Sequence, residues 1–209
     1  MEIPPIPSQG VSANLQTRVV NILTKPAQEW PVIASEPKDI AGLYRNYIVL
    51  LAAIPAVCGL IGMSVVGMTL PFGGGHFRVP IVTGIGNAVV GYVLGLVGVY
   101  VAALVIAKLA PTFQSQPDVA QAVKLVAYSS TPMWVAGVLS LVPALAVIGL
   151  LAGLYGLYIM YLGIGPLMKT PSDKTIPYMV VSIIVLIVLY VIVGTVAAVV
   201  MPTAPRVTL

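Results

Sequence analysis

Four long apolar stretches, separated by short polar segments, dominate the chain. They cover residues 46–70, 81–107, 125–167 and 178–201, and none contains an Asp, Glu, Lys, Arg or His. An α-helix rises about 1.5 Å per residue, so roughly 20 apolar residues cross a hydrocarbon core about 30 Å thick. The first, second and fourth stretches therefore each have the length of one membrane-spanning helix.

The third stretch is about twice as long as one span requires. Pro143 lies near its middle, and proline interrupts helices. This pattern predicts two spans joined by a tight turn. The sequence thus predicts an all-α membrane protein, a bundle of five transmembrane helices within residues 46–201, at about 46–70, 81–107, 125–142, 145–167 and 178–201.

Composition supports this reading and narrows the chemistry. Apolar residues make up 59% of the chain and charged residues 8%, whereas soluble domains carry about 25% charged residues. Proton-coupled pumps and intramembrane zinc or aspartyl proteases need ionisable groups within the bilayer. The apolar stretches contain none, so we expect no enzymatic activity, no metal and no cofactor.

The basic residues predict the orientation, because positive charge near a helix end resists translocation. Five spans put eight of the ten Lys and Arg residues on one side and two on the other, whereas four spans would divide them six to four. We therefore predict a cytoplasmic amino terminus and a carboxyl terminus on the opposite side. The larger group comprises Arg18, Lys25, Lys38, Arg45, Lys108, Lys124, Lys169 and Lys174, and the smaller comprises Arg78 and Arg206. These cations are spread over loops, so no nucleic-acid partner is expected.

The residues before the first span divide into two parts. Residues 1–13 are rich in proline and are expected to form a mobile tail. Residues 14–45 are expected to form a cytoplasmic interfacial segment that begins with a short amphipathic helix on the membrane surface. The apolar face of this helix comprises Leu15, Val19, Ile22 and Leu23. Residues 202–209 are expected to form a short non-cytoplasmic tail.

Aromatic residues predict where the chain meets the lipid headgroups. Trp30, Tyr155, Tyr158 and Tyr161 are interpreted as interfacial anchors, because their rings are apolar and their polar tips remain hydrated. A partner-binding role for Trp30 and a ligand-stacking role for the tyrosines are the alternatives.

Small residues recur at steps of four and three along the helix predicted at 81–107, which places them on one face. Lipid gives helices no hydrophobic reason to associate, so close backbone approach must hold them together. The helix at 145–167 repeats the pattern. We predict helix-packing seams at Gly84, Ala88, Gly91, Gly95, Gly98 and Ala102, and at Gly149, Gly153, Gly156 and Gly163.

Two prolines interrupt predicted spans. Pro55 lies in the first, and Pro132 in the third frees the carbonyl of Tyr128, four residues earlier. The adjacent hydroxyls of Ser129, Ser130 and Thr131 are interpreted as local repair of that break. A path for a small solute is the alternative.

The order of these features resembles the Yip1 family of integral membrane proteins, particularly its bacterial members, over about residues 15–201. Pro26 and Trp30 precede the spans, and the other shared features follow in the order Tyr128-Ser-Ser-Thr-Pro-Met-Trp134, Pro143, Tyr155-Gly-Leu-Tyr158, Pro166 and the loop 171–174. The resemblance implies five helices, a cytoplasmic amino terminus and, for a bacterial member, the inner membrane.

Eukaryotic Yip1 relatives are associated with vesicle trafficking and Rab-type GTPases. Their acidic Asp-Leu-Tyr-Gly-Pro stretch is only loosely echoed by Asp39, Leu43 and Tyr44, so no GTPase partner is expected. The leading hypothesis is a non-enzymatic protein that organises lipids, membrane-protein partners or copies of itself. The alternative is a channel or carrier that uses the hydroxyls and the proline-broken helices.

Overall fold

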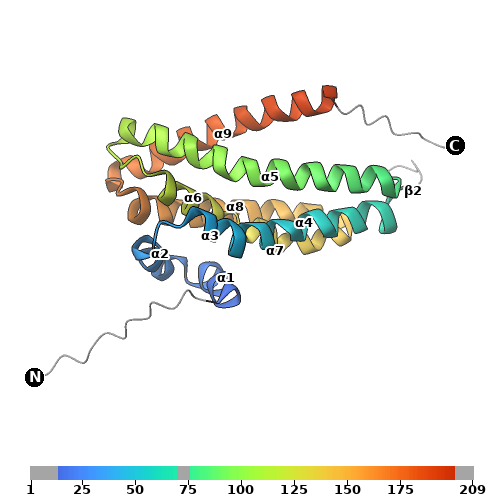
Figure 1. Ribbon diagram of the computed structural model, residues 1–209, viewed down its shortest axis with the longest axis horizontal. Coiled ribbons are helices and arrows are strands. Elements are labelled where there is room, and N and C mark those ends of the chain that lie inside the picture. Colours follow the sequence, from blue (N-terminus) through green and yellow to red (C-terminus); the bar gives the residue numbers. More distant parts are fainter. Residues whose placement is uncertain (1–13, 70–75, 201–209) are drawn as a thin grey trace, which may run out of the picture.

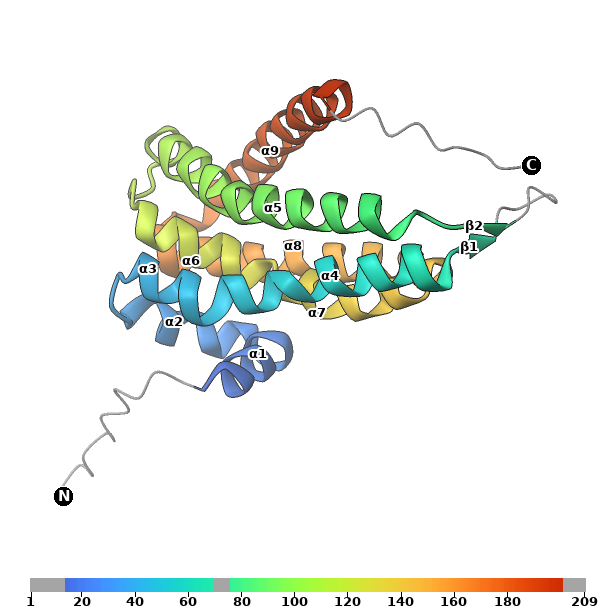
Figure 2. The same cartoon turned by 45° about the vertical axis from the view of Figure 1, so that its right-hand side comes forward.

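Among the described residues, four long helical segments lie roughly side by side, a fifth slants away from them toward the carboxyl-terminal end, and two short helices pack against the bundle near one end (Figure 1 and Figure 2). The computed structural model describes residues 14–69 and 76–200. The predicted tails at 1–13 and 202–209 lie outside the described residues. The helices are α1 (Leu15–Thr24), α2 (Pro26–Ser35), α3 (Ile40–Leu43), α4 (Val49–Ile61), α5 (Ile81–Leu109), α6 (Val119–Ser129), α7 (Thr131–Ala136), α8 (Ala146–Met168) and α9 (Ser172–Val200).

The first long segment is continuous from α3 to Val66. Two π-helical turns, Tyr44–Ile48 and Gly62–Val66, flank α4. Pro55 lies inside α4 without ending it. It packs against Gly137, where an added Cβ would lie 2.7 Å from the Pro55 Cβ. A glycine on the neighbouring segment thus makes room for the proline.

A short antiparallel hairpin connects α4 to α5. Its strands are β1 (Met68–Thr69) and β2 (His76–Phe77), with Met68 paired to Phe77. Helix α5 then runs back beside α4, as Figures 1 and 2 both show. It ends in a 3-10 turn, Ala110–Phe113.

The third apolar stretch folds back on itself near Pro143, as predicted. Helices α6 and α7 lead into 3-10 turns at Gly137–Leu141 and Pro143–Leu145, and α8 then returns along α6 and α7. The helix predicted at about 125–142, with its interruption at Pro132, is divided in the structure into two helices. Helix α6 begins earlier, at Val119, and ends at Ser129; Pro132 lies in the first turn of α7, where its missing N–H leaves no intrahelical bond unmade.

Three segments of the described residues are long, continuous and apolar enough to cross a bilayer: Ile40–Val66, Ile81–Phe113 and Leu151–Met168. The segment from α6 to Leu141 is broken, and part of α9 is not described at the level of side chains. The described part of the chain is therefore helical apart from the small hairpin, and the count of five spans stays a prediction.

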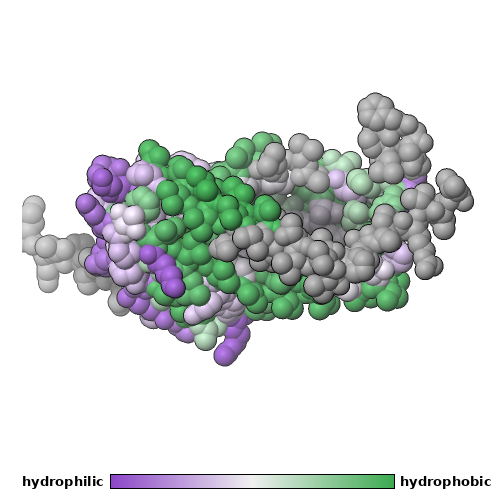
Figure 3. All heavy atoms as spheres, turned by 90° about the horizontal axis from the view of Figure 1, so that it is seen from above, coloured by the Kyte–Doolittle hydropathy of each residue, from purple (hydrophilic) through white to green (hydrophobic). Residues whose placement is uncertain are grey.

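The regions predicted to be cytoplasmic meet at one end of the bundle. Gln116 donates its backbone N–H to the Met168 carbonyl at 2.8 Å, and Lys38 forms an ion pair with Asp118. Hydrophilic residues gather at this end, while hydrophobic residues cover most of the length seen in Figure 3. The largest fully buried side chains, among them Ile22, Trp30 and Tyr178, also belong to elements at this end. The other half of the bundle turns apolar side chains outward, as a membrane-embedded surface requires.

Candidate functional site: a buried polar network

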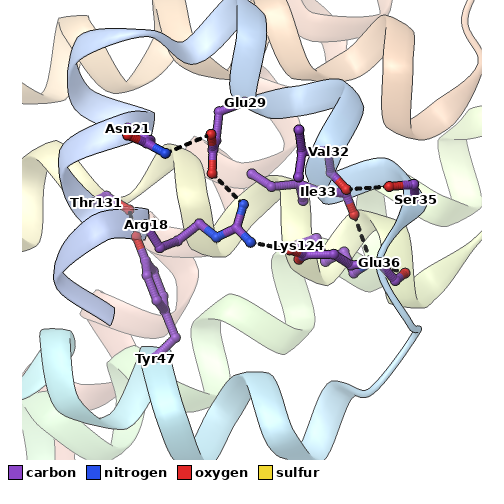
Figure 4. A network of polar contacts seen from close by, with 10 residues as sticks. All are labelled: Arg18, Asn21, Glu29, Val32, Ile33, Ser35, Glu36, Tyr47, Lys124 and Thr131. Atoms are coloured by element: carbon purple, nitrogen blue, oxygen red, sulfur yellow. Dashed lines mark hydrogen bonds and ion pairs between the residues drawn. The ribbon is translucent and has the colours of Figure 1, made fainter. Parts of the chain in front are cut away.

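A buried arginine joins the two amino-terminal helices. Arg18 of α1 is only 5% exposed, and its Nη1 donates to Glu29 Oε1 of α2 at 2.5 Å. Its Nη2 donates to Glu36 Oε1, just after α2, and Asn21 Nδ2 donates to Glu29 Oε2 at 3.1 Å. Figure 4 shows these side chains converging between the helices. Because a buried charge is costly unless it is paired and hydrogen-bonded, the pairing holds α1 against α2.

A buried lysine joins this pair of helices to the bundle. Lys124 of α6 donates from Nζ to the carbonyls of Ile33, at 2.9 Å, and Glu36, at 2.7 Å. The last carbonyls of a helix lack intrahelical partners and carry partial negative charge, so an ammonium group satisfies the end of α2. Burial lowers the pKa of Lys124 below its usual value.

Aromatic rings pack against the network. The guanidinium carbon of Arg18 lies 5.8 Å from the centroid of the Tyr128 ring, within the range of a cation–π contact. Trp30 and Tyr47 meet the same ring edge-on, with centroids 6.2 and 4.7 Å away. Tyr47 and Thr131 share a hydrogen bond of 2.7 Å between their hydroxyls. The network thus connects α1, α2, α6 and α7 to the first long segment.

The structure corrects two expectations for residues 14–45. Trp30 is fully buried instead of lying among lipid headgroups, and its indole Nε1 donates to the Ile159 carbonyl at 3.0 Å. Ile22, on the expected lipid-facing side of α1, is also fully buried in protein. The reason is that α2 packs on α8, where Gly163 leaves the space that Trp30 fills. We call α1 and α2 together the amino-terminal cap.

The three tyrosines predicted as anchors have different environments. Tyr155 donates its hydroxyl to the Leu23 carbonyl at 2.6 Å, so it holds the cap. Its ring stacks on Tyr158, with centroids 5.9 Å apart. Tyr158 and Tyr161 are exposed, and their contact with headgroups stays a prediction.

The hydroxyl run near Pro132 is engaged within the protein. Ser130 Oγ donates to the Val126 carbonyl at 2.8 Å, and Thr131 Oγ1 lies 3.5 Å from the Ala127 carbonyl as well as bonding Tyr47. The hydroxyls thus bond the carbonyls of Val126 and Ala127 instead of the Tyr128 carbonyl that Pro132 was expected to free. The Ser130 backbone N–H also donates to the Val126 carbonyl, at 3.0 Å. Ser129 Oγ is buried and has no hydrogen-bond partner among the described residues.

The small residues of α5 form a close helix contact only in part. An added Cβ at Gly84 would lie 2.4 Å from Ser64 Oγ, but at Gly91, Gly95 or Gly98 it would meet no atom within 4 Å. Gly91 and Gly95, with Ala88, instead line a groove of about 470 Å³ between α4 and α5. Tyr92 connects the two helices across this groove, because its hydroxyl donates to the Val49 carbonyl at 2.9 Å. The helices are thus joined here through a side chain and not by close backbone contact.

The small residues of α8 lie against different elements. An added Cβ would lie 2.6 Å from the Ser129 carbonyl oxygen at Gly156, and 2.6 Å from Trp30 Cε2 at Gly163. At Gly153 the nearest atom would be the Met133 methyl, 3.9 Å away, and at Gly149 there is none within 4 Å. Close contact is therefore confined to the end of α8 that carries the cap.

Sequence reasoning missed the network because it assigned Arg18 and Lys124 to loops as orientation signals. One signal was available. Leu15, Arg18 and Ile22 follow the spacing of a single helix face, which places the arginine among apolar residues. Among the described residues no group of His, Cys, Asp and Glu is arranged to hold a metal.

Comparison with known proteins decides the family. The Yip1 domain model matches residues 20–194, which include Glu29, Glu36 and Lys124 of the network. The chain belongs to the Yip1 family. This Yip1 chain is 30% identical over 166 residues to "Inner membrane protein YohC" of Escherichia coli strain K12 and to its counterpart in strain O6:H1. The match covers 78% of the chain and 84% of each relative. No solved structure matches it.

These relatives agree with an integral protein of a bacterial inner membrane. The resemblance to Yip1 proteins noted from the sequence is confirmed. Neither the domain description nor the names of the relatives state an enzymatic activity.

Proposed function

We propose that this Yip1-family protein is a non-catalytic membrane protein with five spans that organises partner proteins, and that its amino-terminal cap is the docking surface. The observation that carries the proposal is the buried network of Arg18, Glu29, Glu36 and Lys124. Helices of ten residues are marginal in isolation, so the cap owes its order to the bundle beneath it.

A cap held in one position is suited to recognition. Its outward residues, such as Gln16, Gln28 and Val32, are exposed, while the charges beneath them are paired internally. A preordered surface loses little conformational freedom when a partner binds. The network therefore supports docking more than chemistry, because its polar groups are occupied by one another.

The five-span orientation is part of the proposal. The cap, the Ser115–Thr170 contact and the Lys38–Asp118 ion pair all lie at one end of the bundle, with most of the basic residues. Arg78 lies at the other end, beside the hairpin. This distribution supports a cytoplasmic cap, since basic residues favour the cytoplasmic side.

Site-specific photocrosslinking in native membranes tests the docking role. A crosslinker at Gln28, on the exposed surface of α2, is expected to capture a recurring partner. The same crosslinker in a Glu29→Gln/Glu36→Gln variant, which removes the carboxylates that pair with Arg18 and so loosens α1 from α2, is expected to lose that partner. A crosslinker at Ile184, an exposed apolar residue of α9, is the matched control for nonspecific neighbours. Equal capture from Gln28 in both chains would contradict the proposal.

A carrier for a small solute is the second candidate, favoured by the groove that Pro55 lines. The structure gives it less support, because the hydroxyls of Ser130 and Thr131 bond within the protein. Flux into proteoliposomes that depends on Ser129, Ser130 and Thr131 would favour the carrier over the docking role.

A further inference from the structure

The groove between α4 and α5 lies in the half of the bundle away from the cap. Its walls are the small residues Ala52, Ala56, Gly59, Ala88, Gly91 and Gly95, together with larger apolar side chains that include Leu60, Met63 and Trp134. Both wall helices belong to segments apolar enough to span a membrane, so the groove lies at membrane depth. Its surroundings there are lipid, not water.

A positive charge lies at the hairpin end of this groove. Val79 lines the groove and donates its backbone N–H to the Met63 carbonyl at 3.0 Å, and Arg78 directly precedes it. The Arg78 side chain is exposed, and its Nε donates to His76 Nε2 at 3.2 Å. Every carboxylate in the described part of the chain belongs to the cap end of the bundle: Glu29, Glu36, Asp39, Asp118 and Asp173. No described carboxylate is therefore available to neutralise Arg78.

Polarity falls along the groove from that end. Asn87, whose side chain is exposed, lines it six residues into α5, about 9 Å along the helix axis. Gly91 and Gly95 follow at successive turns, and an added Cβ at either position meets no protein atom within 4 Å. From the hairpin inward the order is the guanidinium of Arg78, which adjoins the groove without lining it, then the amide of Asn87, then a largely apolar slot in which the Tyr92 hydroxyl bonds the Val49 carbonyl.

This order matches the order of groups in a glycerophospholipid. Arginine binds phosphate oxygens through charge-assisted hydrogen bonds. An asparagine amide donates to an ester carbonyl, and an acyl chain fills an apolar slot. A helix of a second copy would fill the slot but would leave Arg78 without an anion.

We propose that the α4–α5 groove is a binding site for a glycerophospholipid of the leaflet opposite the cap, with its phosphate on Arg78 and one acyl chain beside Gly91 and Gly95. The inference rests on the proposed orientation of the spans and is independent of what the cap binds.

Lipid retention tests the site. The full chain is incorporated in nanodiscs of phosphatidylglycerol and phosphatidylethanolamine, extracted in mild detergent and examined by native mass spectrometry. Wild-type protein is expected to keep one phospholipid. Gly91→Leu/Gly95→Leu, which fills the groove, is expected to reduce the lipid-bound fraction at least fivefold. Gly86→Leu/Gly98→Leu is the matched control, because these two glycines of α5 are equally open but do not line the groove.

A second variant keeps the test decisive if the filled groove disturbs folding. Arg78→Gln changes an exposed side chain outside the helices and is expected to reduce retention, whereas Arg78→Lys is expected to retain most of it. Equal retention by all variants, or equal loss in both glycine pairs, overturns the lipid site. So does a dimer that Gly91→Leu/Gly95→Leu dissociates without any change in bound lipid. Crosslinking from Gln28 that continues in the groove variants would show that the docking role survives even if the lipid site fails.

Discussion

Trp30 donates its indole N–H to the carbonyl of Ile159, 129 positions later in the chain, at 3.0 Å. Both residues are fully buried, and the bond connects α2 of the cap to α8 of the bundle. Gly163, one turn further along α8, lies against the same indole ring. The cap is therefore attached to the bundle by a specific fit, in which the large Trp30 side chain fills the space that Gly163 leaves by having no side chain.

Gly163→Ala is expected to destabilise the protein by about 1–3 kcal/mol, because the new methyl group would lie 2.6 Å from Trp30. Gly165→Ala is the matched control, two residues away, where an added Cβ meets nothing within 4 Å. The control is expected to be neutral or slightly stabilising, since alanine is the better helix former. Thermal unfolding in detergent measures both, and equal melting temperatures for the two variants would contradict the fit.

Arg18→Met is expected to cost about 3–5 kcal/mol, because it leaves the carboxylates of Glu29 and Glu36 in the cap without their cation. Arg18→Met/Glu29→Met is expected to recover part of that loss, and the two variants with Glu29→Met form a double-mutant cycle. Lys174→Met, which breaks an exposed pair with Asp173, is the control and is expected to stay within about 1 kcal/mol of the wild type. Additive effects in the cycle would show that Arg18 and Glu29 do not interact.

Asp118 is expected to make stability depend on acidic pH. Partial burial works toward a higher pKa, but the bond to Lys38 and the backbone N–H of Gln121 outweigh it, so the pKa of Asp118 lies below its usual value. A carboxyl group with a lowered pKa in the folded state stabilises above its unfolded pKa, and the contribution is lost as pH falls through the folded pKa. Wild-type protein should therefore lose stability below about pH 4.

Asp118→Asn is the test of this titration, because asparagine still caps α6 but carries no charge. Its unfolding free energy should fall less than that of the wild type between pH 5 and pH 3. The difference is expected to stay below about 1 kcal/mol, since Lys38 is 59% exposed. An identical pH profile for the two proteins would exclude a role for Asp118.

A reporter fused after Leu209, beyond the described residues, tests the five-span orientation. A fluorescent protein that matures only in the cytoplasm is expected to stay dark there and to be bright when inserted after Lys169, between α8 and α9. The physical reason is that the cap, the α5–α6 connection and the α8–α9 turn share the basic end. Fluorescence at Leu209 would show an even number of spans.

The long helices were predictable because the stability of a segment in the bilayer depends mainly on the length and apolar composition of that segment itself. Helices α5 and α8 correspond to uninterrupted apolar stretches, and the reversal near Pro143 follows from the conformational limits of proline. The break at Ser130 shows where this reasoning stops. The position of Pro132 indicated a disturbed helix, but not that two separate helices result or that Tyr47 of another segment bonds Thr131 at the start of the second.

Amino-acid sequence alone determined that the chain is a helical membrane protein and that its apolar stretches contain no ionisable group, and it predicts the orientation of its basic loops. Each of these follows from residue type and spacing, because transfer into lipid is a property of each segment. Only the tertiary structure decided that Trp30 is buried, that Arg18 and Lys124 join one network, and that Gly91 and Gly95 line a groove while Gly163 receives a side chain. These outcomes depend on segments that are distant in the sequence and meet only in the folded chain. The same residue type can therefore serve as an interfacial anchor, an orientation signal or a packing position, depending on which residues of other segments contact it.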